Sequence, residues 1–351
     1  MNQVTLSRVD GERRAQATLV RLLCAASIWR TIITRILPIC GSASWWTALC
    51  CLLPGLGVAA LLRLTMFLTD ADTLMEAMRA ALGKMGAAVL AVVLFVLLMT
   101  EAVSFMNSLI TLFIQGIGTS GTPWSLALLT GGMLLLSLHR EGLARGAYLL
   151  RKTIAAGVIL LAAALLMDAE VDHLFPLYGN GKTAVWQGFE AGFSLAWPVM
   201  LFLMVQPAKG RGRLRSTLLP AVVPVGMVLL VTLSIPHEVL MRHDGMANLL
   251  MLSAVYMPNS LRVLFLVLLM LIFFLATSAS VQVGTQTLLS VVKHPPGWVS
   301  YAVMCLLFLT QVEGTERIST LLHTIEPWLI VPLAVLALVS WPLALHRRKC
   351  P

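Results

Sequence analysis

The sequence is poor in charged residues. Asp, Glu, Lys and Arg make up only 12% of its 351 residues, whereas hydrophobic residues make up 58%. The mean hydropathy is +0.88. Soluble globular domains carry about 25% charged residues. The composition therefore excludes an ordinary soluble domain, and we expect the whole chain to be one integral membrane protein.

Patterns typical of enzyme and metal sites are also missing. The six cysteines form no C-x-x-C pair and no His/Cys cluster with the spacing of metal ligands. The sequence shows no Ser/His/Asp arrangement and no phosphate-binding glycine loop. We therefore expect no enzyme activity, no cofactor and no metal. The net charge of +9 does not indicate nucleic acid as a partner, because the basic residues stand in short clusters between apolar runs.

Long apolar runs make up most of the chain. A transmembrane helix needs about 20 apolar residues, and ten segments approach this length. They are residues 17–38, 44–64, 87–113, two runs within 122–167, and residues 186–205, 217–235, 263–292, 298–311 and 328–345. We expect ten transmembrane helices embedded in the lipid bilayer, in a membrane domain that covers residues 17–345.

A basic hinge between the two runs within residues 122–167 gives the expected orientation. The hinge, HREGLARGAYLLRK, covers residues 139–152, and Lys and Arg in short loops stay in the cytoplasm. Counting outward from the hinge makes residues 1–16 and 346–351 cytoplasmic tails. It puts 19 of the 25 Lys and Arg on the cytoplasmic side. Residues 312–327 then form an outer loop.

The segment 67–86, FLTDADTLMEAMRAALGKMG, has a different pattern. Its apolar residues recur at helical spacing: Leu74, Met75, Met78 and Leu82. We expect an amphipathic helix that lies on the cytoplasmic face of the membrane and is capped by Asp70 or Asp72.

Charges inside two of the apolar runs are the sharpest candidates for function. Arg30 lies in the first run and Glu101 near the middle of the third, where a charge costs about 2.5–3.5 kcal/mol. Glu101 can relay a proton or cation, or contact the amino group of a ligand. The alternative is a structural ion pair between Arg30 and Glu101. Arg35 lies nearer the outer end of the first run, and we expect its side chain to extend to that surface.

The sixth run, residues 186–205, contains residues that weaken a helix. Gly188, Gly192 and Pro198 loosen or remove backbone hydrogen bonds, and such backbone suits a place where it lines a cavity. We favour a broken helix at a binding site, although Gly and Pro are common in transmembrane helices. For the first run, which has no glycine before Gly41, the two interpretations are balanced.

Aromatic and small residues in the sixth run complete this part of the candidate site. Phe189 and Trp197 can wall a pocket for a small ligand, beside Gly192 and Ser194. The alternative is that these aromatic side chains only pack against neighbouring helices.

A polar patch in the eighth run, ATSASVQVGTQT, covers residues 276–287. Ser278 and Gln282 offer a hydroxyl and an amide at bilayer depth, and we include both among the candidate substrate-binding residues. Small polar residues more often serve to pack transmembrane helices together, and that interpretation is the favoured one for the patch.

Four segments occur in an order that resembles the spore germination permeases. HREGLARGA is similar to the Gly-hydrophobic-Glu-x-x-Ala-Arg elbow of this family, and FLTDADTLMEAMRAALGKMG is similar to its surface helix. GTPWSLALL resembles the start of its fourth span, and HLFPLYGNG resembles its outer segment before the sixth. The resemblance covers most of residues 17–210. These permeases are the membrane-spanning B subunits of nutrient germinant receptors, within the amino-acid/polyamine/organocation superfamily.

The resemblance implies an all-α fold of ten transmembrane helices in a 5+5 inverted repeat of the leucine-transporter type. The first repeat covers about residues 17–167 and the second about 186–345, and the first helix of each is broken at the ligand site. The resemblance also implies two partner subunits, a membrane subunit with a cytosolic domain and a lipoprotein. The expected location is the bacterial cell membrane or the inner spore membrane.

Three functions are compatible with such a chain. The leading hypothesis is a receptor subunit that binds a small nutrient, such as an amino acid, between the repeats and signals to its partner subunits. The second is a secondary amino-acid transporter coupled to protons or cations through Glu101. The third is a divergent copy kept as a structural scaffold, which the arginines of the first run favour.

Overall fold

The computed structural model describes residues 3–117, 132, 140–167, 169–201, 213–240, 259–291 and 315–349. Every regular element in these ranges is a helix, so the expected all-α class is confirmed. Five helical segments are long and apolar enough to cross a membrane. They are Arg14–Leu68, Leu74–Leu112, Glu141–Met167, Arg262–Leu289 and Trp328–His346.

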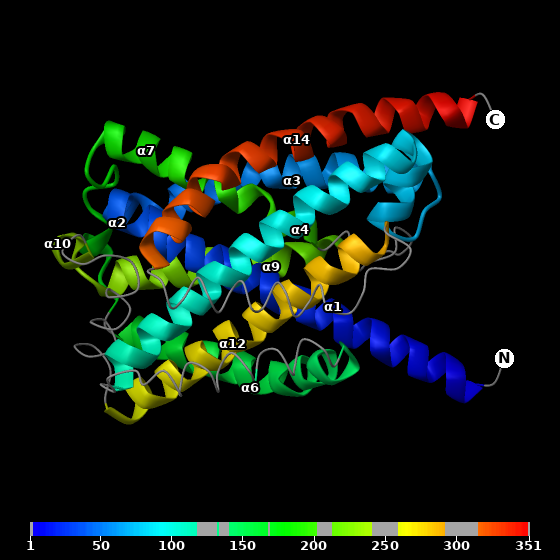
Figure 1. Ribbon diagram of the computed structural model, residues 1–351. Coiled ribbons are helices and arrows are strands. Elements are labelled where there is room, and N and C mark those ends of the chain that lie inside the picture. The colour runs from blue at the N-terminus through cyan, green and yellow to red at the C-terminus, as the bar shows by residue number, and fades with distance from the viewer. Residues whose placement is uncertain are drawn as a thin grey trace.

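The first of these segments contains two long helices. α1 (Gln3–Thr31) continues through the π-helix η1 (Ile32–Ile36) into α2 (Leu37–Cys40), and the 3-10 turn η2 (Gly41–Ala43) leads to α3 (Ser44–Leu68). Gly41 has a φ of 55°, which glycine adopts without a steric penalty. Figure 1 shows α1 and α3 running in opposite directions on either side of this turn. Since α1 begins at Gln3, most of the expected tail 1–16 is helical and continuous with the first apolar run.

α4 (Leu74–Ile117) joins the expected surface helix to the third apolar run. Gly83, with φ 80° and ψ −170°, separates the two parts. The buried residues of the first part recur at helical spacing: Leu74, Ala77, Met78 and Ala81. Glu76 and Arg79 on the other side are exposed, so the amphipathic pattern is confirmed.

The cap of this helix differs from the expected one. The Glu76 N–H donates to Thr73 Oγ1 and the Thr73 N–H donates to the Glu76 carboxylate, each over 3.3 Å. This reciprocal pair is a capping box. Asp70, which has a φ of 55°, and Asp72 lie in the turn before it, so the expectation that one of them caps the helix was wrong.

The later helices pack around α1, α3 and α4. They are α6 (Arg140–Met167), η3 (Val171–Leu174), α7 (Lys182–Gly192), η4 (Phe193–Ala196), η5 (Pro198–Met200), α9 (Arg213–Ser234), α10 (His237–Leu240), α12 (Asn259–Leu289) and α14 (Thr315–Lys349). α12 packs along α4, and α14 packs on α3 and α4, which gives the elongated bundle in Figure 1.

The first and the sixth apolar runs are both irregular, in different ways. The sixth run is broken as expected, because α7 ends at Gly192 and two short 3-10 turns follow before Leu201. The first run is distorted but not unwound, because η1 is a π-helix between two α-helical stretches.

α14 begins earlier than the sequence suggested. Residues 312–327 were expected to form an outer loop, but the helix begins at Thr315 and continues to Lys349. Its first turns carry apolar residues at helical spacing, namely Ile318, Leu321, Leu322 and Ile325. Consequently Glu326 lies within a helix and is 1% exposed.

The two ends of the bundle differ in charge. The start of α1 and the end of α14 lie at the same end in Figure 1. Arg145 of α6 comes within 4.0 Å of Glu12 there, and Arg79 donates to the Ser290 carbonyl. We call this the basic end, and we call the opposite end, with Glu170 and the residues after it, the acidic end.

Parts of the expected topology lie outside the described residues. These are most of the fourth run, including GTPWSLALL, the last residues of the sixth run, and the ninth run, residues 298–311. The count of ten spans and the inverted repeat therefore stay predictions.

Glycines set how closely α7 approaches the first two long helices. A Cβ at Gly188 would lie 2.1 Å from Cys40 Sγ, and a Cβ at Gly192 would lie 2.7 Å from Cys51 Sγ and 2.8 Å from Ile36 Cδ1. The two glycines are four residues apart and so share one face of the helix. Small residues at this spacing let helix backbones approach closely.

We expect Gly188→Ala to lower the thermal unfolding temperature of the detergent-solubilised protein, because overpacking costs about 1–3 kcal/mol. Adding Cys40→Ala should restore most of the loss by removing the clashing sulfur. The matched control is Gly57→Ala in α3, where a Cβ would meet no atom within 4 Å. Equal effects of the two single glycine changes would contradict close packing at Gly188.

Candidate functional site

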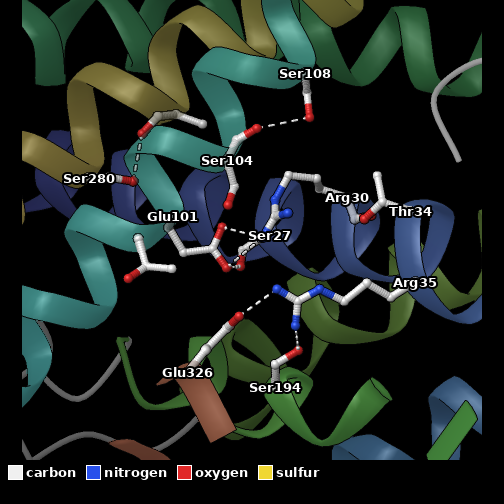
Figure 2. A network of polar contacts seen from close by, with 12 residues as sticks. Ser27, Arg30, Thr34, Arg35, Glu101, Ser104, Ser108, Ser194, Ser280 and Glu326 are labelled. Atoms are coloured by element: carbon white, nitrogen blue, oxygen red, sulfur yellow. Dashed lines mark hydrogen bonds and ion pairs between the residues drawn. The ribbon is translucent and has the colours of Figure 1, made fainter. Parts of the chain in front are cut away.

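Four charged side chains from three parts of the chain, three of them buried and one partly buried, lie close together (Figure 2). We call Arg30, Arg35, Glu101 and Glu326 the charged cluster. Arg30 Nη2 lies 3.0 and 2.9 Å from the two carboxylate oxygens of Glu101. Both side chains are almost fully buried, with exposed fractions of 3% and 1%. The structure thus contains the structural ion pair that was one of the two interpretations of Glu101.

Ser27 adds a hydrogen bond to the first pair. Its hydroxyl donates to Glu101 Oε1 over 2.9 Å. The Arg30 guanidinium also lies 5.5 Å from the centre of the Phe105 ring, which attracts cations through its π-electrons. Glu101 therefore has partners on α1 for both oxygens.

The second pair joins Arg35 to Glu326 of α14. Arg35 Nη2 lies 2.5 Å from Glu326 Oε2, and Arg35 Nη1 donates to Ser194 Oγ over 3.0 Å. Trp197 Nε1 donates to Glu326 Oε1 over 3.3 Å. Arg35 is only 15% exposed, so the expectation that it extends to the outer surface was wrong: it has a carboxylate partner inside the bundle.

The π-helix η1 explains why both arginines reach the same cluster. In an α-helix, residues five apart are about 140° apart around the axis, since each residue turns about 100°. In η1 the Leu37 N–H bonds to the Ile32 carbonyl, which is the i→i+5 pattern of a π-turn. Residues five apart then come closer to alignment. The wider turn therefore brings Arg35 toward the face of the helix that carries Arg30.

The cluster is electrically balanced. Two guanidinium groups face two carboxylates, and Glu101 also interacts electrostatically with Arg35 and Glu326. Buried charges persist in proteins when they are paired and hydrogen-bonded. Removing one member leaves an opposite charge without compensation, which costs about 3–5 kcal/mol.

The structure brings some predicted site residues into the cluster and places others elsewhere. Glu101, Ser194 and Trp197 contact cluster charges directly. Gly192 lies just before Ser194 at the break of α7 and packs against Ile36. Phe189 lies with Trp46 and Trp186 in an aromatic group, with ring-centre distances of 6.1 and 6.5 Å.

The two candidates in the eighth run, Ser278 and Gln282, have different surroundings. Ser278 donates to the Phe274 carbonyl of its own helix over 3.1 Å. Thr277, Ser280, Thr285 and Thr287 make the same kind of bond. Gln282 lines a separate cavity at the basic end.

Sequence reasoning missed Ser27 and Glu326. Ser27 is three residues before Arg30 and so lies on the same helix face, which is a usable signal. Glu326 was assigned to a loop because of the residues before it. The second arginine in the first run was the available signal, since a buried Arg35 requires a carboxylate.

At the acidic end, hydrogen bonds join the segment before α7 to α2, η2 and α3. The contacts are Ser42 Oγ to the Pro176 carbonyl at 2.7 Å, Trp46 Nε1 to the Leu177 carbonyl at 3.0 Å, and Asn180 Nδ2 to the Ile39 carbonyl at 3.1 Å. The segment before α7 is thereby held to the turn between α2 and α3.

His237 joins the same contacts from α10. The Ser42 N–H donates to His237 Nδ1 over 3.2 Å, and His237 Nε2 lies 3.2 Å from Asn180 Oδ1. Nδ1 therefore accepts a hydrogen bond and Nε2 carries the ring's hydrogen, so the imidazole is neutral. Burial lowers the pKa of His237 from its ordinary value, and the nearby Glu238 carboxylate acts in the opposite direction.

No metal site appears in the residues that the structure describes: no three His, Cys, Asp or Glu side chains there are grouped to hold an ion. No protein-family model matches the chain, and no curated protein matches its sequence. The resemblance to the spore germination permeases therefore stays a prediction.

We expect Arg30→Gln and Glu101→Gln each to destabilise the protein more than the double change does. Each single change leaves a buried charge unpaired, at a cost of about 3–5 kcal/mol, whereas the double change leaves none. The measurement is a double-mutant cycle on thermal or denaturant unfolding in detergent. The control cycle uses the exposed pair Glu141–Arg145, whose coupling should be about 0.5 kcal/mol or less. Additive effects at Arg30 and Glu101 would contradict the pairing.

The neutral His237 predicts a pH dependence of stability. Its pKa is lower in the folded protein than its ordinary 6.5, so its contribution is fully present above pH 6.5. It is lost as the pH falls from 6.5 through the lowered pKa, because the unfolded chain takes up the proton first. The unfolding temperature should therefore drop between pH 7 and about 5, and His237→Gln should flatten this drop. An identical pH profile for the variant would refute the assignment.

Proposed function

We propose that the chain is the permease-type subunit of a spore germinant receptor. It senses a small nutrient, of the amino-acid class, in the middle of the membrane and signals to partner subunits. The expected partners are a membrane subunit with a cytosolic domain and a lipoprotein. In this proposal the protein lies in the bacterial cell membrane or the inner spore membrane, with both termini and the basic end in the cytoplasm.

The observation that carries the proposal is the charged cluster at the break of the sixth run. Arg35 contacts Ser194 in η4 and Glu326 in α14, and Arg30 contacts Glu101 in α4. The distorted first run is thus tied to the broken sixth run by the hydrogen bond from Arg35 to Ser194, and to α4 and α14 by the two ion pairs. A bilayer-depth charge usually faces a functional cavity or another charge.

The chemistry of the cluster matches a zwitterion. An amino acid carries one carboxylate and one ammonium group. A carboxylate can replace Glu326 at the guanidinium of Arg35, and an ammonium group can bind the carboxylate that this exchange releases. Such an exchange keeps every charge paired, which is the condition for burying a charged ligand.

Ligand exchange in the cluster provides a route to signalling. The ligand shifts a conformational equilibrium only by its difference in affinity for the two states. A ligand that binds the exchanged state about 100-fold more tightly shifts the equilibrium by about 2.7 kcal/mol. Separation of Arg35 from Glu326 would free α14 from η1 and change the surface offered to a partner subunit.

The second candidate function is secondary transport coupled to protons or cations. Glu101 favours this alternative, because an acidic residue at bilayer depth can carry a proton between the two sides. Its two partners on α1 hold it in place in the present state. The same cluster could open alternately toward each side.

Direct binding tests the proposal. We expect one or more radiolabelled amino acids, assayed singly on the protein in lipid nanodiscs, to bind saturably. Arg35→Gln should weaken binding by about tenfold or more, the loss for one charge-assisted hydrogen bond. The matched control is Arg151→Gln in α6, an exposed arginine stacked on Tyr148. No binding by any common amino acid, or equal effects of the two changes, would overturn the proposed site.

A transport assay then separates the two functions. Proteoliposomes are loaded with a proton or sodium gradient, and uptake of the amino acid that binds is followed over time. A receptor subunit should bind without accumulating the label against its gradient. Accumulation that Glu101→Gln abolishes would instead establish the transporter.

A further inference from the structure

A cavity of about 360 Å³ lies at the basic end, between α1 and α6. Three residues of each helix line it, namely Gly11, Glu12, Ala15, Arg145, Tyr148 and Leu149. We call it the interfacial cavity. None of these six residues belongs to the charged cluster or lines the cavity beside Gln282. The interfacial cavity is therefore a separate feature of the bundle.

The position of the interfacial cavity matches the level at which both helices enter a bilayer. On α1 its lining ends at Ala15, just before the apolar run that begins at residue 17. On α6 its lining ends at Leu149, and residues 153–167 carry no charge. Both helices are long and apolar enough to cross a membrane. Tyr148 suits this level, because tyrosine is enriched where lipid headgroups meet the hydrocarbon.

Arg145 is the basic residue in the wall of the cavity. Its Nη2 lies 3.1 Å from a Glu141 oxygen and 4.0 Å from a Glu12 oxygen. Both contacts use the same nitrogen, and 57% of the side chain is exposed. Nε and Nη1 make no hydrogen bond to any residue that the structure describes. A guanidinium presents its N–H groups as a fork that fits a phosphate, so these donors remain for an anion.

Three more basic side chains lie around the cavity. The Arg151 guanidinium stacks on the Tyr148 ring, 3.9 Å from its centre. Lys152 is four residues after Tyr148 and so lies on the same helix face. Arg14 precedes Ala15 on α1. All three are exposed, and none forms an ion pair within the described part of the chain.

We propose that the interfacial cavity binds the headgroup of an anionic phospholipid. The four basic side chains outnumber the two nearby carboxylates, Glu12 and Glu141, so the surroundings favour a ligand with net negative charge. The lipid phosphate accepts hydrogen bonds from Arg145. A zwitterionic phospholipid offers the same phosphate but brings a cation with it, so it binds more weakly.

The occupant is a lipid because of what borders the cavity. Leu149 in its wall is 76% exposed, and the uncharged part of α6 begins four residues later. The acyl chains of a bound lipid therefore have an apolar helix surface to lie against while the headgroup contacts Arg145. A phosphate ion in water would gain nothing from this surface.

The inference goes beyond the proposed receptor function and does not rest on it. The charged cluster depends on Arg35 and its partners, none of which lines this cavity. Arg35→Gln should weaken amino-acid binding and leave lipid binding unchanged. A failure at either site therefore leaves the proposal for the other one standing.

Native mass spectrometry of the full chain in detergent tests the inference, because it resolves the first bound lipid. The probes are dioleoylphosphatidylglycerol and dioleoylphosphatidylcholine, which share their acyl chains and differ in net charge. We expect the anionic lipid to bind about tenfold or more tightly than the zwitterionic one. Arg145→Gln should weaken binding of the anionic lipid by about tenfold or more, the loss for one charge-assisted hydrogen bond. The matched control is Arg79→Gln, which removes another exposed arginine at the basic end.

A second variant fills the cavity without changing its charge. Gly11 lines the cavity, and a Cβ there would meet no atom within 4 Å, so Gly11→Phe places a ring in the space of the headgroup. It should weaken binding of the anionic lipid by about tenfold or more. Equal affinity for the two lipids, equal effects of Arg145→Gln and Arg79→Gln, or unchanged binding in Gly11→Phe would overturn the site. Displacement of the lipid by an equal concentration of inorganic phosphate would also overturn it, since the free anion would then be the ligand.

Discussion

Buried charge must be compensated, and this requirement organises the middle of the bundle. Two arginines of the first run enter a region where an unpaired charge is costly. Each finds a carboxylate on a different helix, Glu101 on α4 and Glu326 on α14. Because the partners are far apart in the sequence, the pairing fixes how three long helices sit relative to one another.

Local irregularities of the backbone serve this pairing. The π-helix η1, which follows α1, brings Arg35 toward the helix face that carries Arg30. The glycines of α7 allow that helix to approach α2 and α3, so that Ser194 comes within reach of Arg35. Deviations from ideal helix geometry therefore concentrate where polar groups meet, as π-bulges and broken helices often do in functional regions.

The sequence predicted those features that depend on local chemistry. Helices follow from long apolar runs, the surface helix from the spacing of Leu74 and Met78, and the break in the sixth run from its Gly and Pro residues. The partnership of Arg30 and Glu101 could be anticipated, because each is an isolated charge of opposite sign. The partner of Arg35 was not identified, because residues 312–327 were assigned to an outer loop, whereas α14 begins at Thr315 and carries Glu326.

The π-helix η1 also relates the charged cluster to the cavity beside Gln282. One residue of an α-helix corresponds to a rotation of about 100°. If η1 were to relax to α-helical geometry, everything before it in α1 would rotate by an angle of this order relative to Arg35. That half of the helix carries Arg30, and it also carries Gln16 and Val20, which line the cavity beside Gln282. The geometry of η1 thus sets how α1 is rotated about its axis relative to Arg35. A rotation of α1 would move Arg30 in the charged cluster and Gln16 and Val20 in the cavity together.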